Sequence, residues 1–317
     1  MFKYIMKKLV SLVLMTIAIS LVIFLMVNAT GVDPVAQQFS ANEYDEKLVA
    51  ARRHELGLDK PIMERYWDWI TGLLHGDFGK SSTSGFTMKE AIKIKWPATF
   101  EIAFTGLVIS SILGIGIGAL SAYWQNGIID YVGRFFAVLG NAVPSYFLAL
   151  VLIQVFAIKL KWLPATGRVS VGSKGFFARI PNMVLPVTAL SIPMCGSLMR
   201  YTRNTMLDMS SKEYVKFARS KGMPEGKIWV KHIFRNSLRP IITVLLSRAT
   251  ILIGGSVTID AIFCWPGIGS MLSSAATSSD YSVVMFSALT TAIVMQVISF
   301  LMDMTTALLD PRVKLED

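Results

Sequence analysis

The sequence predicts an all-α integral membrane protein with six transmembrane helices. Of its 317 residues, 53% are hydrophobic and only 16% are charged, and the mean hydropathy is +0.53. Soluble domains have nearer to a quarter of their residues charged. The apolar residues gather in long runs, and a run of about twenty is enough to cross a bilayer as a helix. These runs occupy residues 9–29, 98–122, 134–158, 181–200, 241–261 and 282–307.

The first run follows three lysines and in that respect resembles a signal peptide. The apolar region of a signal peptide, however, has only about 7–15 residues. Here the apolar residues continue from Leu9 to Val27, which is long enough to span. We therefore interpret residues 1–29 as an N-terminal tail and a retained first transmembrane helix.

The second run starts with a recognisable helix signal. Pro97 suits the first helical position, and Glu101 falls in the first turn, where a negative charge favours the helix dipole. The glycines Gly114, Gly116 and Gly118 are spaced as in some nucleotide loops, but no strand precedes them and no phosphate-binding lysine follows. The sequence therefore predicts close packing of this helix against a neighbour.

Two prolines and the cysteines complete the description of the spans. Pro144 and Pro193 fall inside the third and fourth runs, where a missing backbone hydrogen bond predicts a kink or a contact with a neighbouring helix. Cys195 lies within a predicted span and Cys264 beyond the end of one. They show no metal-like spacing, and we expect no disulfide.

The distribution of charge predicts the orientation. Residues 200–240 contain ten basic and three acidic side chains, a net charge of +7, and hydrocarbon cannot solvate them. Placing this segment and the lysine-bearing tail inside satisfies the positive-inside bias, and an even number of spans puts both termini in the cytoplasm. The total charge of +10 thus indicates a membrane topology rather than a nucleic-acid partner. Residues 30–97, with nine basic and ten acidic side chains, are then extracytoplasmic.

One segment disagrees with this topology. Residues 159–179 carry five basic side chains and no acidic one, in a loop that the topology places outside. The positive-inside bias is statistical, and the total still favours the same orientation. The five are Lys159, Lys161, Arg168, Lys174 and Arg179.

The basic segment 200–240 predicts two short helices around a turn. Gly222 suits a left-handed helix cap, and Pro224 suits the start of the next helix. The first helix has an apolar stripe, and the second has an apolar and a basic one. Such helices could dock into a groove on a cytosolic protein or lie on anionic lipid, and the residues favour neither alternative. The stripes consist of Leu207, Tyr214, Phe217 and Ala218; of Val230, Phe234 and Leu238; and of Lys227, Lys231, Arg235 and Arg239.

This segment resembles the coupling segment of ATP-binding-cassette (ABC) importer permeases, specifically of the oligopeptide/dipeptide/nickel branch. The similar stretches are Tyr214–Gly222, His232–Asn236 and Pro240. The wider family has Glu-Ala-Ala before its glycine, so that only Ala218 and Gly222 carry over from that general motif. Other similar stretches follow in order along nearly the whole chain: Leu56–Pro61, Trp69, Gly76–Gly79, Leu163–Gly167, Phe263–Gly269 and Asp310–Arg312.

The resemblance implies a type I importer permease with coupling helices between the fourth and fifth spans. Residues 98–310 would form the permease core and 311–317 a cytoplasmic tail. The partners would be a second permease subunit, two cytosolic ATPase subunits that bind ATP and Mg²⁺, and an extracytoplasmic substrate-binding protein. The cargo would be an oligopeptide or dipeptide, with nickel, heme and glutathione as alternatives, and the location a bacterial or archaeal cytoplasmic membrane. The ATPase-coupling residues would be Tyr214, Phe217, Ala218, Arg219, Lys221, Gly222, His232, Arg235 and Asn236.

Polar residues inside the runs are candidates for the translocation pathway. Arg248 lies about eight residues into the fifth run, where a charge indicates function unless it extends to the inner surface. Asp260 is either an outer gate contact or a solvated helix end, and we expect Asp303 to pair with a cytoplasmic arginine. The remaining candidates either line the route or join helices by hydrogen bonds. The pathway candidates are Arg248, Asp260, Asn141, Gln154 and Gln296.

We expect no catalytic, metal or cofactor site in this chain. It has no Ser/His/Asp arrangement and no phosphate loop, so it should not hydrolyse ATP itself. His232 has no cysteine or carboxylate at metal-ligand spacing and should be a solvated or docking histidine. Two other classes stay open: a membrane-embedded enzyme and a scaffold that binds membrane lipid. The enzyme would need two catalytic groups at one depth, whereas Asp260 and Asp303 lie near opposite faces.

Overall fold

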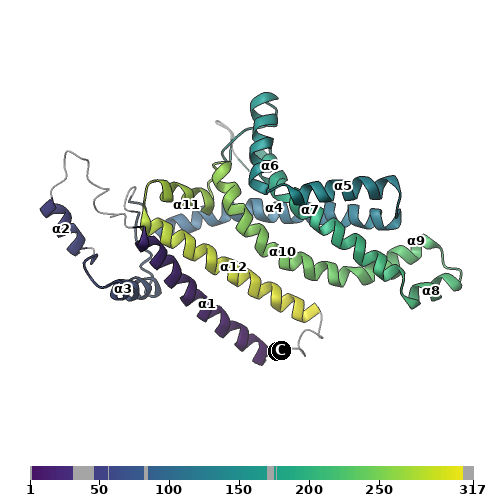
Figure 1. The fold of residues 1–317 in the computed structure, drawn as a ribbon, viewed down its shortest axis with the longest axis horizontal. Coiled ribbons are helices and arrows are strands. Elements are labelled where there is room, and N and C mark those ends of the chain that lie inside the picture. Colours follow the sequence, from purple (N-terminus) through teal and green to yellow (C-terminus); the bar gives the residue numbers. More distant parts are fainter. Residues whose placement is uncertain are drawn as a thin grey trace.

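The structure is a computed structural model that describes residues 2–30, 46–55, 57–81, 85–169, 175 and 177–309. Within these ranges the regular structure is helical, apart from an isolated bridge between Lys80 and Thr87 (Figure 1). Lys174, Leu56 and the Asp310–Arg312 stretch lie outside the described residues. The predicted all-α class is confirmed.

Five helical segments of the described chain are long and apolar enough to cross a membrane, and a bent pair makes a sixth if it counts as one span. The predicted count of six therefore depends on that pair, α5 (Ile128–Ala142) and the segment Ser145–Lys159. The helices of the other five are α1 (Phe2–Ala29), α4 (Met88–Tyr123), α7 (Ile180–Ser210), α10 (Arg235–Ile262) and α12 (Tyr281–Leu309).

The third predicted span is two helices that meet at 102°. Val143 and Pro144 have extended backbone torsions, and a residue before proline is disfavoured in the helical region. The chain restarts as α6 (Ser145–Leu152) and continues as the π-helix η2 (Ile153–Lys159). The predicted break at Pro144 is confirmed, and in Figure 1 α6 stands away from the direction of α5.

The second span begins earlier than the sequence predicts. α4 starts at Met88, so Pro97 lies inside the helix and Glu101 is not in its first turn. Met88 and Trp96 are buried in a cluster with residues of α11 (Ile268–Thr277) and α12, and this packing outweighs the lost hydrogen bond at the proline. α11 itself was not predicted, because its ten residues give too short an apolar run.

Glycines bring α4 close to α7, as predicted. A Cβ on Gly118 would lie 2.7 Å from the Met199 carbonyl oxygen, and one on Gly114 would lie 3.1 Å from the Cys195 carbonyl oxygen. Gly116 has no such neighbour, so only the two glycines on the α7 side are needed for packing. α7 also contacts α5, α6 and α10 and is the most buried of the spanning helices.

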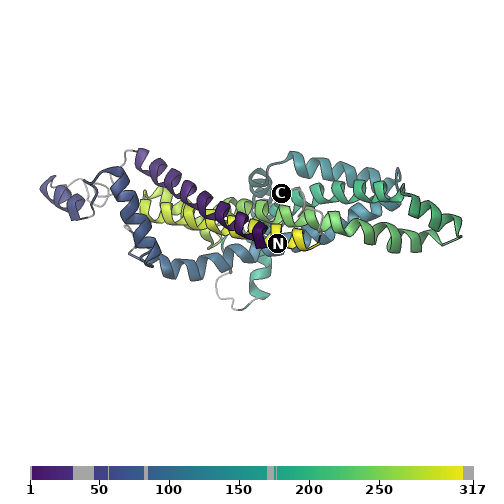
Figure 2. The same cartoon turned by 90° about the horizontal axis from the view of Figure 1, so that it is seen from below.

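α1 and α12 run antiparallel on one side of the molecule (Figures 1 and 2). Lys8 pairs with Asp303 at 3.0 Å, and the Thr16 hydroxyl donates to the Gln296 side-chain oxygen at 3.1 Å. Asp303 thus pairs with a lysine of the first helix rather than with the predicted arginine. The start of α1 and the end of α12 therefore lie on the same side of the helix layer.

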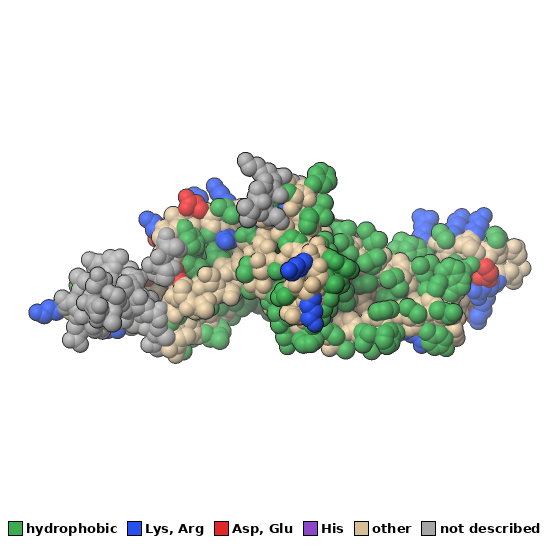
Figure 3. Space-filling view, turned by 90° about the horizontal axis from the view of Figure 1, so that it is seen from above, with side chains coloured by type: hydrophobic (Ala, Val, Ile, Leu, Met, Phe, Trp, Pro, Cys, Tyr) green, Lys and Arg blue, Asp and Glu red, His purple; other side chains and the backbone are tan. Residues whose placement is uncertain are grey.

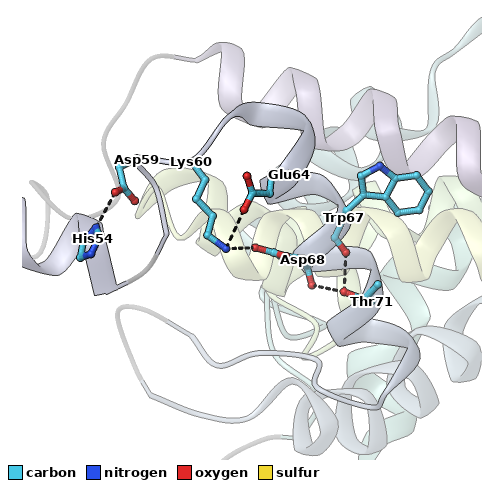
Figure 4. Close-up of polar contacts among 7 residues, drawn as sticks. All are labelled: His54, Asp59, Lys60, Glu64, Trp67, Asp68 and Thr71. Carbon is cyan, nitrogen blue, oxygen red and sulfur yellow. Dashed lines mark hydrogen bonds and ion pairs between the residues drawn. The ribbon is translucent and has the colours of Figure 1, made fainter.

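The segment between α1 and α4 contains α2 (Glu46–Glu55) and α3 (Ile62–Leu74). The Lys60 ammonium pairs with Asp68 at 2.7 Å and with Glu64 at 3.4 Å, which fixes the turn before α3 (Figure 4). Trp69 stacks on Phe24 with ring centroids 5.7 Å apart, so α3 is held against the end of α1.

Candidate functional site

Of the two short helices predicted for the basic segment, the first is present, whereas the second is the start of a long helical run. α7 continues past the predicted end of its span to Ser210 and is followed by α8 (Glu213–Ser220). After the turn, one helical run extends from Glu225 to Ile262. It comprises α9 (Glu225–Lys227), the π-helix η4 (Ile228–Phe234) and α10. In Figure 1 the turn lies at the end of the molecule opposite to α11.

Gly222 closes α8 with a left-handed cap, as the sequence predicts. Its φ is +71°, its N–H donates to the Arg219 carbonyl at 2.9 Å, and the Met223 N–H donates to the Ala218 carbonyl at 3.3 Å. This is the hydrogen-bond pattern of a Schellman motif. A Cβ on Gly222 would meet no atom within 4 Å, so the backbone conformation alone requires glycine here.

One face of the turn packs against the rest of the chain. Val215, Ile228 and Ile233 are completely buried, and Ala218 is nearly so, in a cluster that includes Met206. Ile228 and Ile233 are five residues apart, and the π-helical turn between them brings both to the same face. Ala218 is therefore a packing residue behind the surface of the turn.

The other face of the turn is exposed and combines apolar with basic side chains. Phe217 is 61% exposed, Val230 69% and Tyr214 39%. The predicted apolar stripe is thus divided, because Tyr214 and Phe217 face outward while Ala218 faces inward. Figure 3 shows Lys and Arg side chains gathered at this end of the molecule. The exposed basic residues are Lys216, Arg219, Lys221, Lys227, Lys231, Arg235 and Arg239.

Several polar contacts hold the exposed face in place. Arg219 pairs with Glu225 at 2.7 Å across the turn, and the Lys221 ammonium lies 4.5 Å from the centroid of the Phe217 ring. The exposed Asn236 donates to the His232 carbonyl at 2.7 Å. The half-buried His232 ring has no hydrogen-bond partner for Nε2 in the part of the chain that is described. The predicted coupling residues other than Ala218 and His232 are thus exposed.

An ion pair that the sequence did not predict joins the inner part of α7 to α5. The Arg203 guanidinium donates to the two carboxylate oxygens of Asp130 at 2.6 and 2.8 Å. Asp130 is completely buried and also accepts the Asn126 N–H at 3.0 Å. An aspartate so close to an apolar run was a signal that a partner had to exist.

Arg248 and Asn141, two of the predicted pathway residues, line one cavity of about 190 Å³. The cavity lies where α5 breaks from α6, against the middle of α7 and α10. No hydrogen bond or ion pair of Arg248 occurs within the described ranges, and the Asn141 amide donates to the Ala137 carbonyl at 2.7 Å. The lining residues are Asn141, Ser145, Leu190, Pro193, Met194, Ser197, Arg248, Ile251, Leu252 and Gly255.

The other three pathway candidates lie elsewhere. Gln154 is exposed on η2, and Gln296 accepts the Thr16 hydrogen bond between helices. Asp260 is completely buried, which excludes the solvated helix end; its Oδ2 accepts the Thr99 hydroxyl at 2.6 Å and the Gly269 N–H at 3.3 Å. Thr99 also accepts the Ile268 N–H at 2.9 Å, so these groups join α4 to the loop after α10.

The basic loop after α6 has an acidic partner that the sequence analysis did not find. Glu101 of α4 accepts hydrogen bonds from Arg168 at 2.8 Å and from Arg179 at 3.1 Å. Two of the five basic side chains are therefore neutralised by a carboxylate distant in sequence. The expected role of Glu101 at a helix start is wrong, and its role is to hold this loop against α4.

Comparison with known proteins identifies the family. Residues 114–315 match the binding-protein-dependent transport system inner membrane component family, and residues 1–91 match the N-terminal family of such membrane components. The chain belongs to this family. It is thus a permease subunit of an ABC importer, and the predicted resemblance is confirmed.

Curated relatives of this permease cover nearly the whole chain. The glutathione transport system permease protein GsiC of Pectobacterium atrosepticum is 31% identical over 314 residues, 99% of both chains. The GsiC proteins of Salmonella choleraesuis and of Escherichia coli K12 are each 30% identical over the same share. The relatives are named for glutathione transport, one of the cargoes left open above.

Solved structures show the same fold at low sequence identity. An amino acid ABC transporter crystallised with histidines has a TM-score of 0.55 at 15% identity, covering 69% of this permease and 94% of that chain. The MetNI methionine ABC transporter in inward-facing conformations has a TM-score of 0.53 at 14% identity, covering 70% and 98%. The importer permease fold is therefore confirmed.

Family membership settles the functional class. The family consists of transport permeases of the inner membrane and not of enzymes, so the membrane-embedded enzyme is not supported. Membership of this family implies that the permease has ATPase and permease partners and a binding protein. In this importer permease, the turn at Gly222 and the cavity at Arg248 are candidate sites for such partners and for a cargo.

Proposed function

We propose that this permease forms half of the translocation pathway of an ATP-driven importer of short peptides, glutathione included. Its complex contains a second permease subunit, two ATPase subunits that bind ATP and Mg²⁺, and an extracytoplasmic binding protein. The chain itself binds no nucleotide and converts the free energy of its partners into a change between two conformations.

The observation that carries this proposal is the connection between the turn and the cavity. Two helical runs flank the turn at Gly222: α7 followed by the short α8 before it, and the run from Glu225 to Ile262 after it. Both line the cavity, the first through Ser197 and the second through Arg248. Glu225 lies about 35 Å from Arg248 along a helix at 1.5 Å per residue. Displacing the turn therefore displaces the cavity wall.

The exposed face of the turn is the proposed docking surface for an ATPase subunit. It has the exposed apolar side chains of Phe217, Tyr214 and Val230 together with exposed basic side chains. Val215 and Ile228 are buried behind it, so a force on the exposed face passes into packed side chains. This arrangement favours a protein partner over a surface that merely lies on lipid.

The cargo is inferred from the names of the relatives and from the positive charge of Arg248 at the cavity. The relatives are named for glutathione transport, and glutathione is a short peptide with free carboxylates. An unpaired arginine beside the cavity repels a bare metal cation, which disfavours a free nickel ion but not a negatively charged chelate. For the orientation, we place the turn and both termini in the cytoplasm, since the basic residues gather at the turn.

Uptake by the reconstituted complex tests the proposal. The complex, purified through a tag on this chain, is placed in proteoliposomes with ATP inside and its binding protein outside. We expect ATP-dependent accumulation of labelled glutathione or of labelled dipeptides and tripeptides. Accumulation of a nickel chelate or of heme, with no peptide uptake, would show that the cargo is wrong. A chain that copurifies with no ATPase would contradict the coupling role.

A further inference from the structure

Arg248 carries a charge that the rest of the described chain does not neutralise. It lies in the membrane-crossing part of α10, and within the described ranges it has neither an ion pair nor a hydrogen bond. Arg203 and Lys8, which also lie on spanning helices, pair with Asp130 and Asp303. Because an unpaired charge at membrane depth is costly, we expect a group from outside this chain to neutralise Arg248.

The cavity beside Arg248 has the chemistry of a carboxylate site. Asn141, Ser145 and Ser197 contribute uncharged hydrogen-bonding groups to its wall, and Leu190 and Ile251 contribute apolar surface. A guanidinium can donate two parallel hydrogen bonds to a carboxylate, and neutral amide and hydroxyl groups can serve the neighbouring peptide atoms. The wall thus suits one charged end of a peptide.

The size of the cavity limits what it can hold. The cavity has a volume of about 190 Å³ and is open on one side. A carboxylate and the residue that bears it can enter it, and a longer peptide can extend through the opening. The rest of the cargo would lie outside the cavity, towards the companion subunit.

We propose that Arg248 binds the carboxylate of the peptide cargo, with Asn141, Ser145 and Ser197 around the adjoining peptide atoms. This deepens the proposed function and rests on it. A carboxylate could also come from an aspartate or glutamate of the companion permease. The cargo is favoured because the cavity has polar groups and open space that a single ion pair between subunits does not require.

The experiment compares the uptake of a neutral tripeptide with a free carboxyl terminus with the uptake of its C-terminal amide. Both are measured at limiting concentration in proteoliposomes that contain the whole complex. The acid-to-amide ratio is the uptake of the free acid divided by the uptake of the amide. The binding protein has its own preference between the two peptides. Dividing the ratio of each variant by the ratio of the unsubstituted complex removes that preference. The variants are Arg248→Gln and Arg248→Lys, and Lys93→Gln removes an exposed charge of α4 that does not line the cavity.

We expect Arg248→Gln to lower the acid-to-amide ratio roughly tenfold, a factor equivalent to about 1.4 kcal/mol. Arg248→Lys keeps the charge and should lower the ratio less. If the glutamine variant does not assemble, the ratio measured for the lysine variant tests the proposal. Lys93→Gln should leave the ratio unchanged. If Arg248→Gln slows acid and amide equally, the arginine pairs with the companion subunit and the proposal is wrong. No uptake of either peptide by the unsubstituted complex would instead overturn the proposed function, and this inference with it.

Discussion

The guanidinium of Arg203 donates two hydrogen bonds to the buried carboxylate of Asp130, at 2.6 and 2.8 Å. Arg203 lies on α7 seven residues before that helix ends, and Asp130 lies in the first turn of α5. The pair therefore joins α7, which precedes α8 and the Gly222 turn, to α5, which carries Asn141 of the cavity wall near its end. In the proposed mechanism, a movement of the turn would therefore reach α5 as well as α10.

Breaking this pair from one side should be costly. Arg203→Ala leaves the buried Asp130 carboxylate with the longer contact to Arg134, at 3.4 Å, as its ion pair, and the expected loss of stability is at most about 3–5 kcal/mol. Arg200→Ala, an exposed position on the same helix, is the matched control and should be nearly neutral. Thermal unfolding of the purified complex, followed by size-exclusion chromatography, measures the difference. Equal unfolding temperatures for the two variants would show that the pair contributes little.

Substitution of Gly222 should uncouple ATP hydrolysis from uptake. The left-handed backbone costs a residue with a side chain about 1–2 kcal/mol, so the cap should open in Gly222→Ala. Since a Cβ here meets no neighbouring atom, Gly222→Leu should behave like Gly222→Ala, and Gly222→Asn should be milder.

The control for this prediction is four residues away. Gly226 also has open space for a Cβ but no positive φ, so Gly226→Ala should keep both activities. The measurements are ATP hydrolysis and uptake in the same proteoliposomes. Normal uptake by the Gly222 variants would contradict the proposed mechanical role of the cap.

Thr99 should be important for stability although it touches no cargo. Its hydroxyl donates to Asp260 and accepts the Ile268 N–H, and all three residues are buried. Thr99→Val should cost about 1–3 kcal/mol for each polar group left unpaired. Thr188→Val, where an exposed hydroxyl donates only to the Val184 carbonyl, is the control. The unfolding temperatures of the two variants measure the difference. If Thr188→Val lowers the unfolding temperature as much as Thr99→Val does, the proposed role of the Thr99 hydrogen bonds is wrong.

The proposed orientation can be tested with a native thiol. Cys264 is exposed in the loop after α10, at the end opposite to the turn, whereas Cys195 is half-buried in α7. In a Cys195→Ala chain, a thiol reagent that cannot cross membranes should label Cys264 in intact cells. A cysteine placed by Lys216→Cys in a chain lacking both native cysteines should react only after permeabilisation. The reverse labelling pattern would show that the proposed orientation is the wrong way round.

The sequence predicted the features that depend on neighbouring residues. Long apolar runs gave the spans, Gly222 and Pro224 gave the cap and restart of the turn, and Pro144 gave a break. It did not predict that α4 begins at Met88, because that extension is stabilised by packing against α11 and α12. Local patterns thus indicated where helices exist but not how far packing extends them.

The candidate site was predicted only in part, for the same reason. The depth of Arg248 in its run was enough to single it out, and Asn141 proved to line the same cavity. Asp260 could not be placed from sequence, because its partner Thr99 is 161 positions away. Glu101 was assigned to a helix start, whereas its two arginine partners become neighbours only in the fold.

The glycines that bring α4 against α7 limit how this transporter can be redesigned. At Gly118 even one added methyl group would lie 2.7 Å from the Met199 carbonyl oxygen, so a larger residue there would push the two helices apart. An engineer who wishes to alter which molecules are imported should keep the α4 glycines that contact α7 and vary the cavity wall formed by α6 and α10. Libraries that also vary these glycines would lose members to misfolding before selectivity could be screened.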